Sequence, residues 1–174
     1  MDQEGKALAV MEVAEKNKVI EEEKDILHLV KLSLFQGVPY KAALYLSQAL
    51  EAGKVEKSHK HFEILADAYI QAQEMDQALG ALQKAAPLAP NGETYVRQGQ
   101  IYLEKEDWKK SIESLRKGID KGGLKKPGLA YLALGIAQFK NGATQASLET
   151  FRAAQRYPKY KGQANEWINH LQTE

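Results

Sequence analysis

The chain has 174 residues, a formal net charge of +1 at pH 7 and no cysteine. The lack of cysteine excludes disulfides, thiolate metal sites and cysteine nucleophiles. The near-neutral charge gives no indication of a nucleic-acid-binding protein, and no apolar run reaches the roughly 20 residues that a membrane-spanning helix needs.

The charge is unevenly distributed along the chain. Residues 1–87 contain 10 Lys+Arg and 14 Asp+Glu, a net charge of −4, whereas residues 88–174 contain 14 and 9, a net charge of +5. Such an asymmetry either orients a charged partner or reflects two differently solvated surfaces.

The first predicted element is a helix from Glu4 to Lys16. One of its faces shows a small-large-small pattern of Ala7, Met11 and Ala14. We interpret this helix as the second half of a helix pair whose first half is absent, and expect the chain to begin inside a longer array. The charged segment Lys18–Lys24 is either a connector or the start of the next helix.

Two predicted helices follow, joined by a turn at Gly37-Val38-Pro39, where the proline suits a helix start. The buried face of the first comprises Ile26, Leu29, Val30 and Ser33. The second repeats the small-large-small pattern in Ala42, Leu46 and Ala49. Because Val30 stands where later pairs have a small residue, we expect this pair to be the wider one.

The clearest helix pair lies in residues 62–90. The first helix has residues at spacings of three, four and seven on one face: Phe62, Leu65, Ala66 and Tyr69. After a polar break at Glu74-Met75-Asp76, the second helix has Ala78, Leu82 and Ala85 on one face, and Pro87 and Pro90 end it. Small Ala66 and Ala78 let the two helices approach closely.

This pair resembles a tetratricopeptide repeat, whose pattern is W-x2-L-G-x2-Y, then A-x3-F, then P. Phe62 stands for the Trp, Ala66 for the Gly and Leu82 for the Phe, while Leu65, Tyr69 and Ala78 match and Pro90 ends the unit.

The pattern recurs twice towards the C-terminus. One copy has Tyr95, Gly99 and Tyr102 followed by Ser111, Leu115 and Gly118, and the next has Tyr131, Leu134 and Gly135 followed by Ser147, Phe151 and Ala154. From Ala66 to Gly99 to Gly135 the steps are 33 and 36 residues, on either side of the usual period of about 34. We expect Asp107 to be an N-cap, and Gly122-Gly123 and Asn141-Gly142 to be turns.

A last amphipathic helix follows Tyr157-Pro158, with an apolar stripe of Ala164, Trp167, Ile168 and Leu171. Terminal repeats need such a cap with a polar outer face. The sequence therefore predicts an all-α fold, a right-handed α-solenoid of tetratricopeptide-type helix hairpins with a C-terminal capping helix. We expect a half-repeat and connector over residues 1–22, repeats over 23–56, 59–91, 92–125 and 128–161, and the cap over 163–172.

The resemblance implies a protein-interaction scaffold that has no catalytic residue, cofactor or metal ion and holds a partner peptide or helix on a concave face. Carried over position by position, the groove residues are Leu27, Lys31, Leu34, Glu63, Asp67, Ile70, Val96, Gln100, Leu103, Leu132, Ile136 and Phe139. The last three form an apolar strip, which either accepts a partner segment or is covered by the C-terminal helix.

One specialised version of the groove is disfavoured. Repeats that bind the tails of heat-shock chaperones use a clamp of Lys, Asn and Arg. The corresponding positions here hold Leu27, Lys31, Ile64, Glu93 and Arg97, of which only Arg97 fits.

Motifs of enzymes and metal sites are lacking. The sequence contains no serine-hydrolase elbow, zinc-protease motif, P-loop or dinucleotide fingerprint. His59 and His61 point about 200° apart on a helix, which disfavours a shared metal ion.

Basic residues with two interleaved tyrosines gather late in the chain: Lys109, Lys110, Lys125, Lys126, Arg152, Arg156, Lys159 and Lys161, with Tyr157 and Tyr160. They leave open a contact with nucleic acid or an anionic surface, although lysines on loops and second helices also serve solubility. The sequence leaves open self-association and a role as the regulatory domain of a larger protein as well.

A narrower resemblance concerns Tyr40–Leu50, with the sequence YKAALYLSQAL, and the order of the units. Both are similar to the C-terminal region of bacterial tetratricopeptide proteins that accompany TonB–ExbB–ExbD systems. That resemblance implies a periplasmic protein whose partner belongs to a transport complex for iron-siderophore uptake. Without it, the expected compartment is the cytoplasm.

Overall fold

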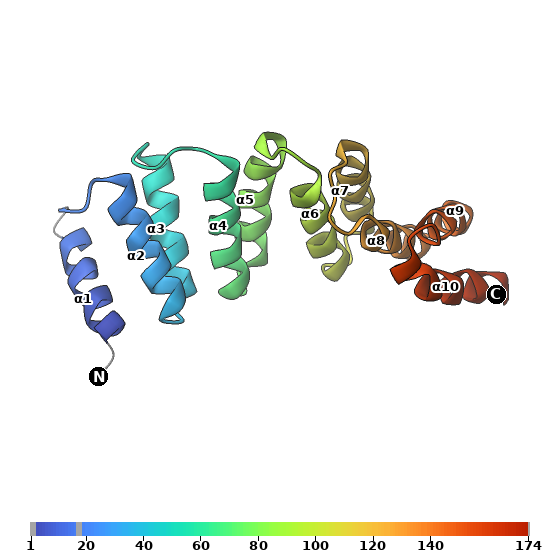
Figure 1. Cartoon of the computed structure of the whole chain (residues 1–174), viewed down its shortest axis with the longest axis horizontal. Helices are drawn as coiled ribbons and strands as arrows, with labels where there is room; N and C mark the ends of the chain where they lie inside the picture. Colours follow the sequence, from blue (N-terminus) through green and yellow to red (C-terminus); the bar gives the residue numbers. More distant parts are fainter. Residues whose placement is uncertain (1–2, 17–18, 174) are drawn as a thin grey trace. The chain divides into compact units, whose positions relative to one another are not determined.

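The computed structural model describes residues 3–16 and 19–173 (Figure 1). Within these ranges every regular element is a helix and there is no strand, so the all-α prediction is confirmed. The chain forms two compact units, Met1–Leu88 and Ala89–Glu174, called the N-terminal and the C-terminal unit below. The parts of the predicted half-repeat and connector at residues 1–2 and 17–18 lie outside the described residues.

The N-terminal unit contains five helices, α1 to α5. Their bounds are Gln3–Lys16, Glu23–Phe35, Pro39–Glu51, His59–Gln71 and Met75–Leu88. Helix α1 packs on α2, α2 pairs with α3, α3 packs on α4, and α4 pairs with α5. Helix α2 begins at Glu23, so the described residues 19–22 are a connector rather than part of that helix.

Small side chains form the contact between α4 and α5, as the pattern predicted. Ala66, Ala78, Leu82 and Ala85 are fully buried. Helices α2 and α3 have fewer residues close to each other than α4 and α5 do, as expected for a wider pair with the larger Val30 on its inner face.

The bounds of α5 differ from the prediction at both ends. The helix begins at Met75, inside the predicted polar break, and the chain turns instead at Gln73, whose φ is 62°. It also continues through Pro87 to Leu88. The helix ends one residue after Pro87 and before Pro90, because Pro87 donates no amide hydrogen bond and its ring crowds the carbonyl of Gln83.

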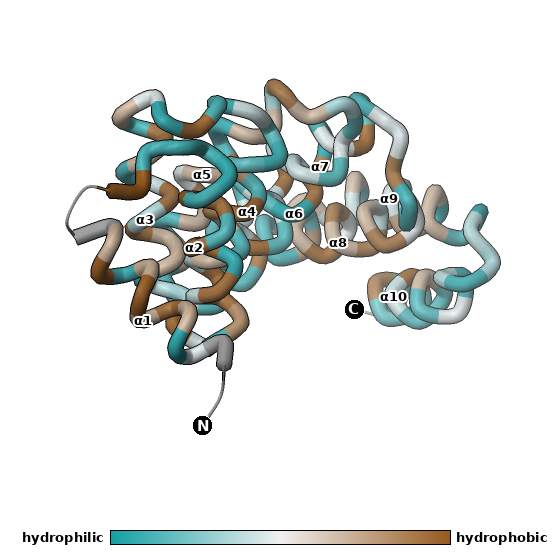
Figure 2. Tube along the Cα trace, turned by 60° about the vertical axis from the view of Figure 1, so that its left-hand side comes forward, coloured by the Kyte–Doolittle hydropathy of each residue, from teal (hydrophilic) through white to brown (hydrophobic). Residues whose placement is uncertain are grey.

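The C-terminal unit contains α6 to α10 and one short 3₁₀ helix, η1. The bounds are Glu93–Glu104, Trp108–Lys121, Pro127–Lys140, Thr144–Ala154 and Lys161–Thr173, with η1 at Pro158–Tyr160. Helix α8 packs against α6, α7, α9 and η1, and in Figure 2 it is brown to pale along much of its length. Its central position therefore follows from its apolar sequence.

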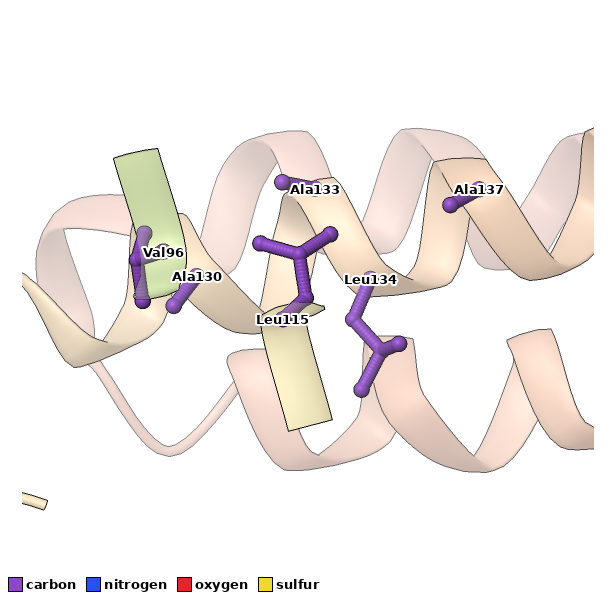
Figure 3. Close-up of a cluster of buried hydrophobic side chains, with 6 residues drawn as sticks. All are labelled: Val96, Leu115, Ala130, Ala133, Leu134 and Ala137. Atoms are coloured by element: carbon purple, nitrogen blue, oxygen red, sulfur yellow. The ribbon is translucent and has the colours of Figure 1, made fainter. Parts of the chain in front are cut away.

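The core between α6, α7 and α8 combines small and large side chains. It comprises Val96, Leu115, Ala130, Ala133, Leu134 and Ala137 (Figure 3). Leu115 is fully buried among the alanines of α8, because small residues on one helix leave room for a large one on the next.

In each hairpin of this unit, a glycine on the first helix packs against a large side chain on the second. A Cβ added to Gly99 would lie 2.5 Å from Cγ of Leu115, and one added to Gly135 would lie 2.5 Å from Cε1 of Phe151. Beside each contact a buried serine donates a hydrogen bond to the glycine carbonyl: Ser111 to Gly99 and Ser147 to Gly135, both at 2.8 Å. The same two contacts thus recur one repeat apart.

The predicted helix ends are confirmed in this unit. The Asp107 carboxylate accepts a hydrogen bond from the backbone N–H of Lys110 at 3.2 Å, and its hydrogen bond to the Lys110 side chain holds the pKa of this carboxyl below its ordinary value. Gly122 and Gly142 have φ values of 72° and 79°. The predicted stripe of α10 faces inwards, with Ala164 and Ile168 buried.

We predict that Gly135→Ala destabilises the C-terminal unit. The new methyl group overlaps the Phe151 ring, and overpacking of this kind costs about 1–3 kcal/mol, which exceeds the gain of about 1 kcal/mol in helix propensity. Thermal unfolding followed by circular dichroism measures the effect.

Gly162→Ala is the matched control for this change, because no atom lies within 4 Å of its added Cβ in α10. It should be neutral or slightly stabilising. Equal melting temperatures for the two variants would show that the Gly135 contact is not a constraint.

Candidate partner-binding site

The C-terminal unit has an open cavity of about 550 Å³, called the C-terminal cavity below. Its lining comes from three helices: Gln100, Leu103 and Glu104 on α6, Leu129, Leu132, Ala133 and Ile136 on α8, and Gln163, Glu166 and Trp167 on α10. The walls are thus mainly apolar, and the polar groups belong to two glutamines and two glutamates.

Trp167 forms a wall of this cavity that is fixed by its neighbours. Its ring stacks on Phe151 with centroids 5.4 Å apart and planes at 8°, and it meets Phe139 at 5.8 Å. Phe151 in turn occupies the space left by Gly135. The wall is therefore preorganised by the core rather than held on a loop.

The two carboxylates at this cavity are exposed and unbalanced by any described cation. Glu104 and Glu166 are both exposed, and neither forms an ion pair or hydrogen bond among the described side chains. Two carboxylates beside apolar walls give the cavity a negative potential.

The N-terminal unit has a second open cavity, of about 520 Å³, called the N-terminal cavity below. Its lining comprises Lys24, Leu27, His28, Val30, Lys31 and Leu34 on α2, and Ile64 on α4. Its charged side chains are Lys24, which forms an ion pair with Glu22 at 2.8 Å, and Lys31, so cations rather than carboxylates line this cavity.

Seven of the twelve predicted groove residues line these two cavities. Gln100, Leu103, Leu132 and Ile136 lie in the C-terminal cavity, and Leu27, Lys31 and Leu34 lie in the N-terminal one. The two sets belong to different units, and their part in binding stays a prediction.

The other five predicted residues lie elsewhere. Glu63, Asp67 and Ile70 are half-buried on α4 and line neither cavity. Val96 is buried in the core, and Phe139 packs against Trp167 and His170 of α10. The capping helix thus covers one end of the predicted apolar strip and leaves Leu132 and Ile136 at the cavity.

Sequence reasoning missed the contribution of α10 to the cavity. Trp167 was assigned only to the packing stripe of the cap, and Glu104 and Glu166 were not considered. The size of Trp167 was the signal for a contribution of α10 to the cavity. The other residues of the α10 stripe are Ala, Ile and Leu, whereas a ring as large as that of tryptophan extends beyond the helix that carries it.

Two further properties concern the described residues only. No group of three or more His, Asp or Glu side chains there is arranged to hold a metal ion. None of the helices in residues 3–16 and 19–173 combines the length and apolar character that crossing a membrane requires.

Comparison with known proteins gives a family and several similar folds. The tetratricopeptide repeat profile matches residues 34–93 and 96–161, whereas comparison with curated protein sequences found no match. The crystal structure of the MamA protein has 24% identity and a TM-score of 0.68, covering 90% of this chain and 84% of that one. The C-terminal part of a tetratricopeptide repeat-containing protein from Cytophaga hutchinsonii has 14% identity and a TM-score of 0.72, covering 97% and 65%.

A third similar structure is YrrB, described as a tetratricopeptide protein with an unusual peptide-binding site. It has 16% identity and a TM-score of 0.69, covering 98% of this chain and 82% of that one. At these identities the likeness concerns the fold, and it confirms the predicted class of α-solenoid with tetratricopeptide hairpins. Because the matched ranges span more than half of the sequence, the chain belongs to the tetratricopeptide repeat family.

Proposed function

We propose that the chain is a protein-interaction scaffold without catalytic activity, and that its C-terminal cavity binds a partner segment with an apolar side chain between cationic residues. Family membership supports the general role, because tetratricopeptide proteins typically hold partner polypeptides. The apolar cavity with Glu104 and Glu166 beside it is the observation that carries the specific proposal.

The size and lining of the cavity suit side chains of a polypeptide. A volume of about 550 Å³ falls within the range of about 300–1,000 Å³ that is typical of ligand pockets. An apolar side chain against Leu103, Ile136 and Trp167 removes its surface from water and supplies most of the affinity. Lysine or arginine on either side of it pairs with the two carboxylates, which adds selectivity and speeds association.

The N-terminal cavity favours the opposite flanking charge. Its apolar wall of Leu27, Leu34 and Ile64 lies beside Lys24 and Lys31. An apolar side chain flanked by Asp or Glu therefore suits this cavity. The two units thus select different segments, on one partner or on two.

We predict that Ile136→Glu weakens binding of cationic-flanked peptides selected on the full chain from a displayed library. The change places a carboxylate against the apolar wall and costs a desolvation penalty. Loss of a central apolar contact typically lowers affinity by about 10- to 100-fold. Fluorescence anisotropy with the selected peptides measures the change.

Val10→Glu is the matched control, because Val10 is 69% exposed on α1 and lines neither cavity. Circular dichroism verifies that both variants are folded. If the Ile136 variant binds every selected peptide as the unchanged chain does, the cavity is not the binding site.

We predict that Glu104→Lys combined with Glu166→Lys reverses the charge preference of the C-terminal cavity. Both side chains are exposed, so the fold is preserved while the potential changes sign. Binding of cationic-flanked peptides should weaken about tenfold at low salt and less above 0.5 M, because salt screens exposed charges.

The control for this reversal is Asp120→Lys combined with Glu149→Lys, which makes the same change in net charge on the same unit away from the cavity. An equal loss of binding in both double variants would mean that the overall charge, and not the cavity, selects the peptide.

A finer assignment, to a TonB-dependent transport complex in the envelope, rests on the resemblance of Tyr40–Leu50. In the structure this segment is most of α3, where Ala42, Leu46 and Ala49 serve helix packing. The exposed residues of this segment are Tyr40, Lys41, Leu44 and Gln48. Because Lys41 forms an ion pair with Glu12 at 2.9 Å, the other three are the ones left to contact a partner.

We predict that the chain, carrying an affinity tag in its native cell, co-purifies with ExbB, ExbD or TonB after cross-linking. Tyr40→Ala combined with Leu44→Ala should reduce that recovery, because it removes exposed apolar contacts without touching the buried face. Quantitative mass spectrometry of the purified material measures it. If none of these three proteins co-purifies with the chain, the assignment to a TonB-dependent complex is wrong.

A further inference from the structure

The C-terminal unit carries a long stretch of one charge sign that the proposed cavity does not use. Between residues 121 and 165 the only acid is Glu149, whereas the basic residues are Lys121, Lys125, Lys126, Lys140, Arg152, Arg156, Lys159 and Lys161. The net charge of +1 for the whole chain therefore conceals a strongly basic segment.

Packing brings five of these cations to one edge of the unit. Lys125 and Lys126 lie in the loop between α7 and α8, and Arg156, Lys159 and Lys161 lie around η1, between α9 and α10. The two segments are adjacent, because η1 packs on α8, and a Cβ added to Gly128 would overlap the side chains of Tyr157 and Tyr160. Lys125, Lys126, Arg156, Lys159 and Lys161 are called the basic edge below.

The basic edge is held in place by its own contacts. The Tyr157 ring stacks on Tyr131 with centroids 5.9 Å apart, and the ammonium group of Lys159 lies 5.9 Å from the centroid of Tyr160. The Glu93 carboxylate accepts a hydrogen bond from the backbone N–H of Lys125. These contacts fix both segments that carry the cations, so little order has to be gained on binding.

The side chains of the basic edge are directed to solvent, and the Glu93 carboxylate lies at the backbone of Lys125 without forming an ion pair with its side chain. All five side chains are exposed, and none forms an ion pair with a described carboxylate. They line neither the C-terminal cavity nor the N-terminal one. A group of exposed cations outside these two cavities is suited to an extended anionic surface.

We propose that the basic edge binds the anionic phospholipid headgroups of a membrane surface, a function beyond the peptide binding proposed above. Clusters of four to eight Lys and Arg are typical of segments that bind anionic leaflets, and each cation near the surface strengthens binding about fivefold. Five cations therefore give reversible, salt-sensitive attachment without any membrane-spanning element.

The tyrosines argue for lipid rather than nucleic acid. Proteins that bind single strands offer open aromatic faces on which bases stack, inside a basic groove. Here the Tyr157 ring faces Tyr131, the Tyr160 ring lies beneath Lys159, and the cations lie outside the cavities. These rings therefore brace the edge instead of providing a stacking platform.

Co-sedimentation of the full chain with vesicles tests the proposal. Vesicles of phosphatidylcholine with about 30% phosphatidylserine should bind the chain at low salt, and pure phosphatidylcholine vesicles should not. Binding should disappear between about 50 mM and 500 mM NaCl, because the Debye length falls several-fold over this range. Lys125→Gln combined with Lys126→Gln should weaken binding about 25-fold, about fivefold for each cation.

Lys109→Gln combined with Lys140→Gln is the matched control. These exposed lysines lie at the opposite ends of α7 and α8, roughly 20 Å along the helices from the loop that joins them. The control should bind as the unchanged chain does. Lys126 makes no capping hydrogen bond with its side chain, so its replacement leaves α8 intact.

Three results would overturn the proposal. The first is no binding to phosphatidylserine vesicles at low salt, and the second is an equal loss in the edge and control variants. The third is tighter binding of the unchanged chain to duplex DNA, single-stranded DNA or polyglutamate than to the vesicles, which would assign the edge to another polyanion.

Discussion

The contact of Gly135 with the Phe151 ring is the constraint on which the C-terminal unit depends. With no Cβ at Gly135, the ring fits directly against α8, and Ser147 ties the two helices together at the same level. The same ring also stacks on Trp167. One missing methyl group thus fixes a hairpin, the angle of the capping helix and a wall of the cavity. A larger residue at position 135 would move all three, because close-packed interiors transmit strain.

The hairpins have different residues at the equivalent contact between their two helices. Gly99 and Gly135 face Leu115 and Phe151, whereas the fully buried Ala66 and Leu82 occupy the matching positions in the N-terminal unit. Of the two hairpins in that unit, the first, which contains Val30, has fewer residues close together across its two helices. Val30 and Leu34 of the same hairpin also line the N-terminal cavity, together with Ile64 of α4. The size of the residue at the Val30 position therefore affects both how closely the two helices of the hairpin pack and the lining of the cavity.

Periodicity predicted most of the fold, because spacings of three and four identify the buried face of each helix directly. The turns at Gly37, Gly122 and Gly142 followed from residues that tolerate positive φ. The sequence failed where the outcome depended on a neighbouring element. Helix α5 begins at Met75, inside the predicted polar break, and ends at Leu88, one residue past Pro87. Repeat position alone does not reveal that Val96 packs in the core with residues of α8, or that Phe139 packs against Trp167 of α10. Trp167 reaches the cavity only through its tertiary stack.

The C-terminal cavity and the basic edge, the two surfaces proposed for the C-terminal unit, carry opposite charges that act on each other. The cavity has Glu104 and Glu166 at its mouth, and the basic edge begins just before α8, whose residues Leu129 to Ile136 line that cavity. Lys126 of the basic edge is only three residues, about 5 Å of helix, from Leu129 of the cavity, which is less than the Debye length of about 10 Å at 0.1 M salt. The charges of the two surfaces therefore remain coupled at moderate salt. An anionic membrane at the edge repels the carboxylates of the cavity and attracts a cationic partner segment. A cationic partner segment that neutralises Glu104 and Glu166 removes the repulsion between these carboxylates and the membrane. Binding of the segment in the cavity and attachment of the edge to the membrane therefore favour each other.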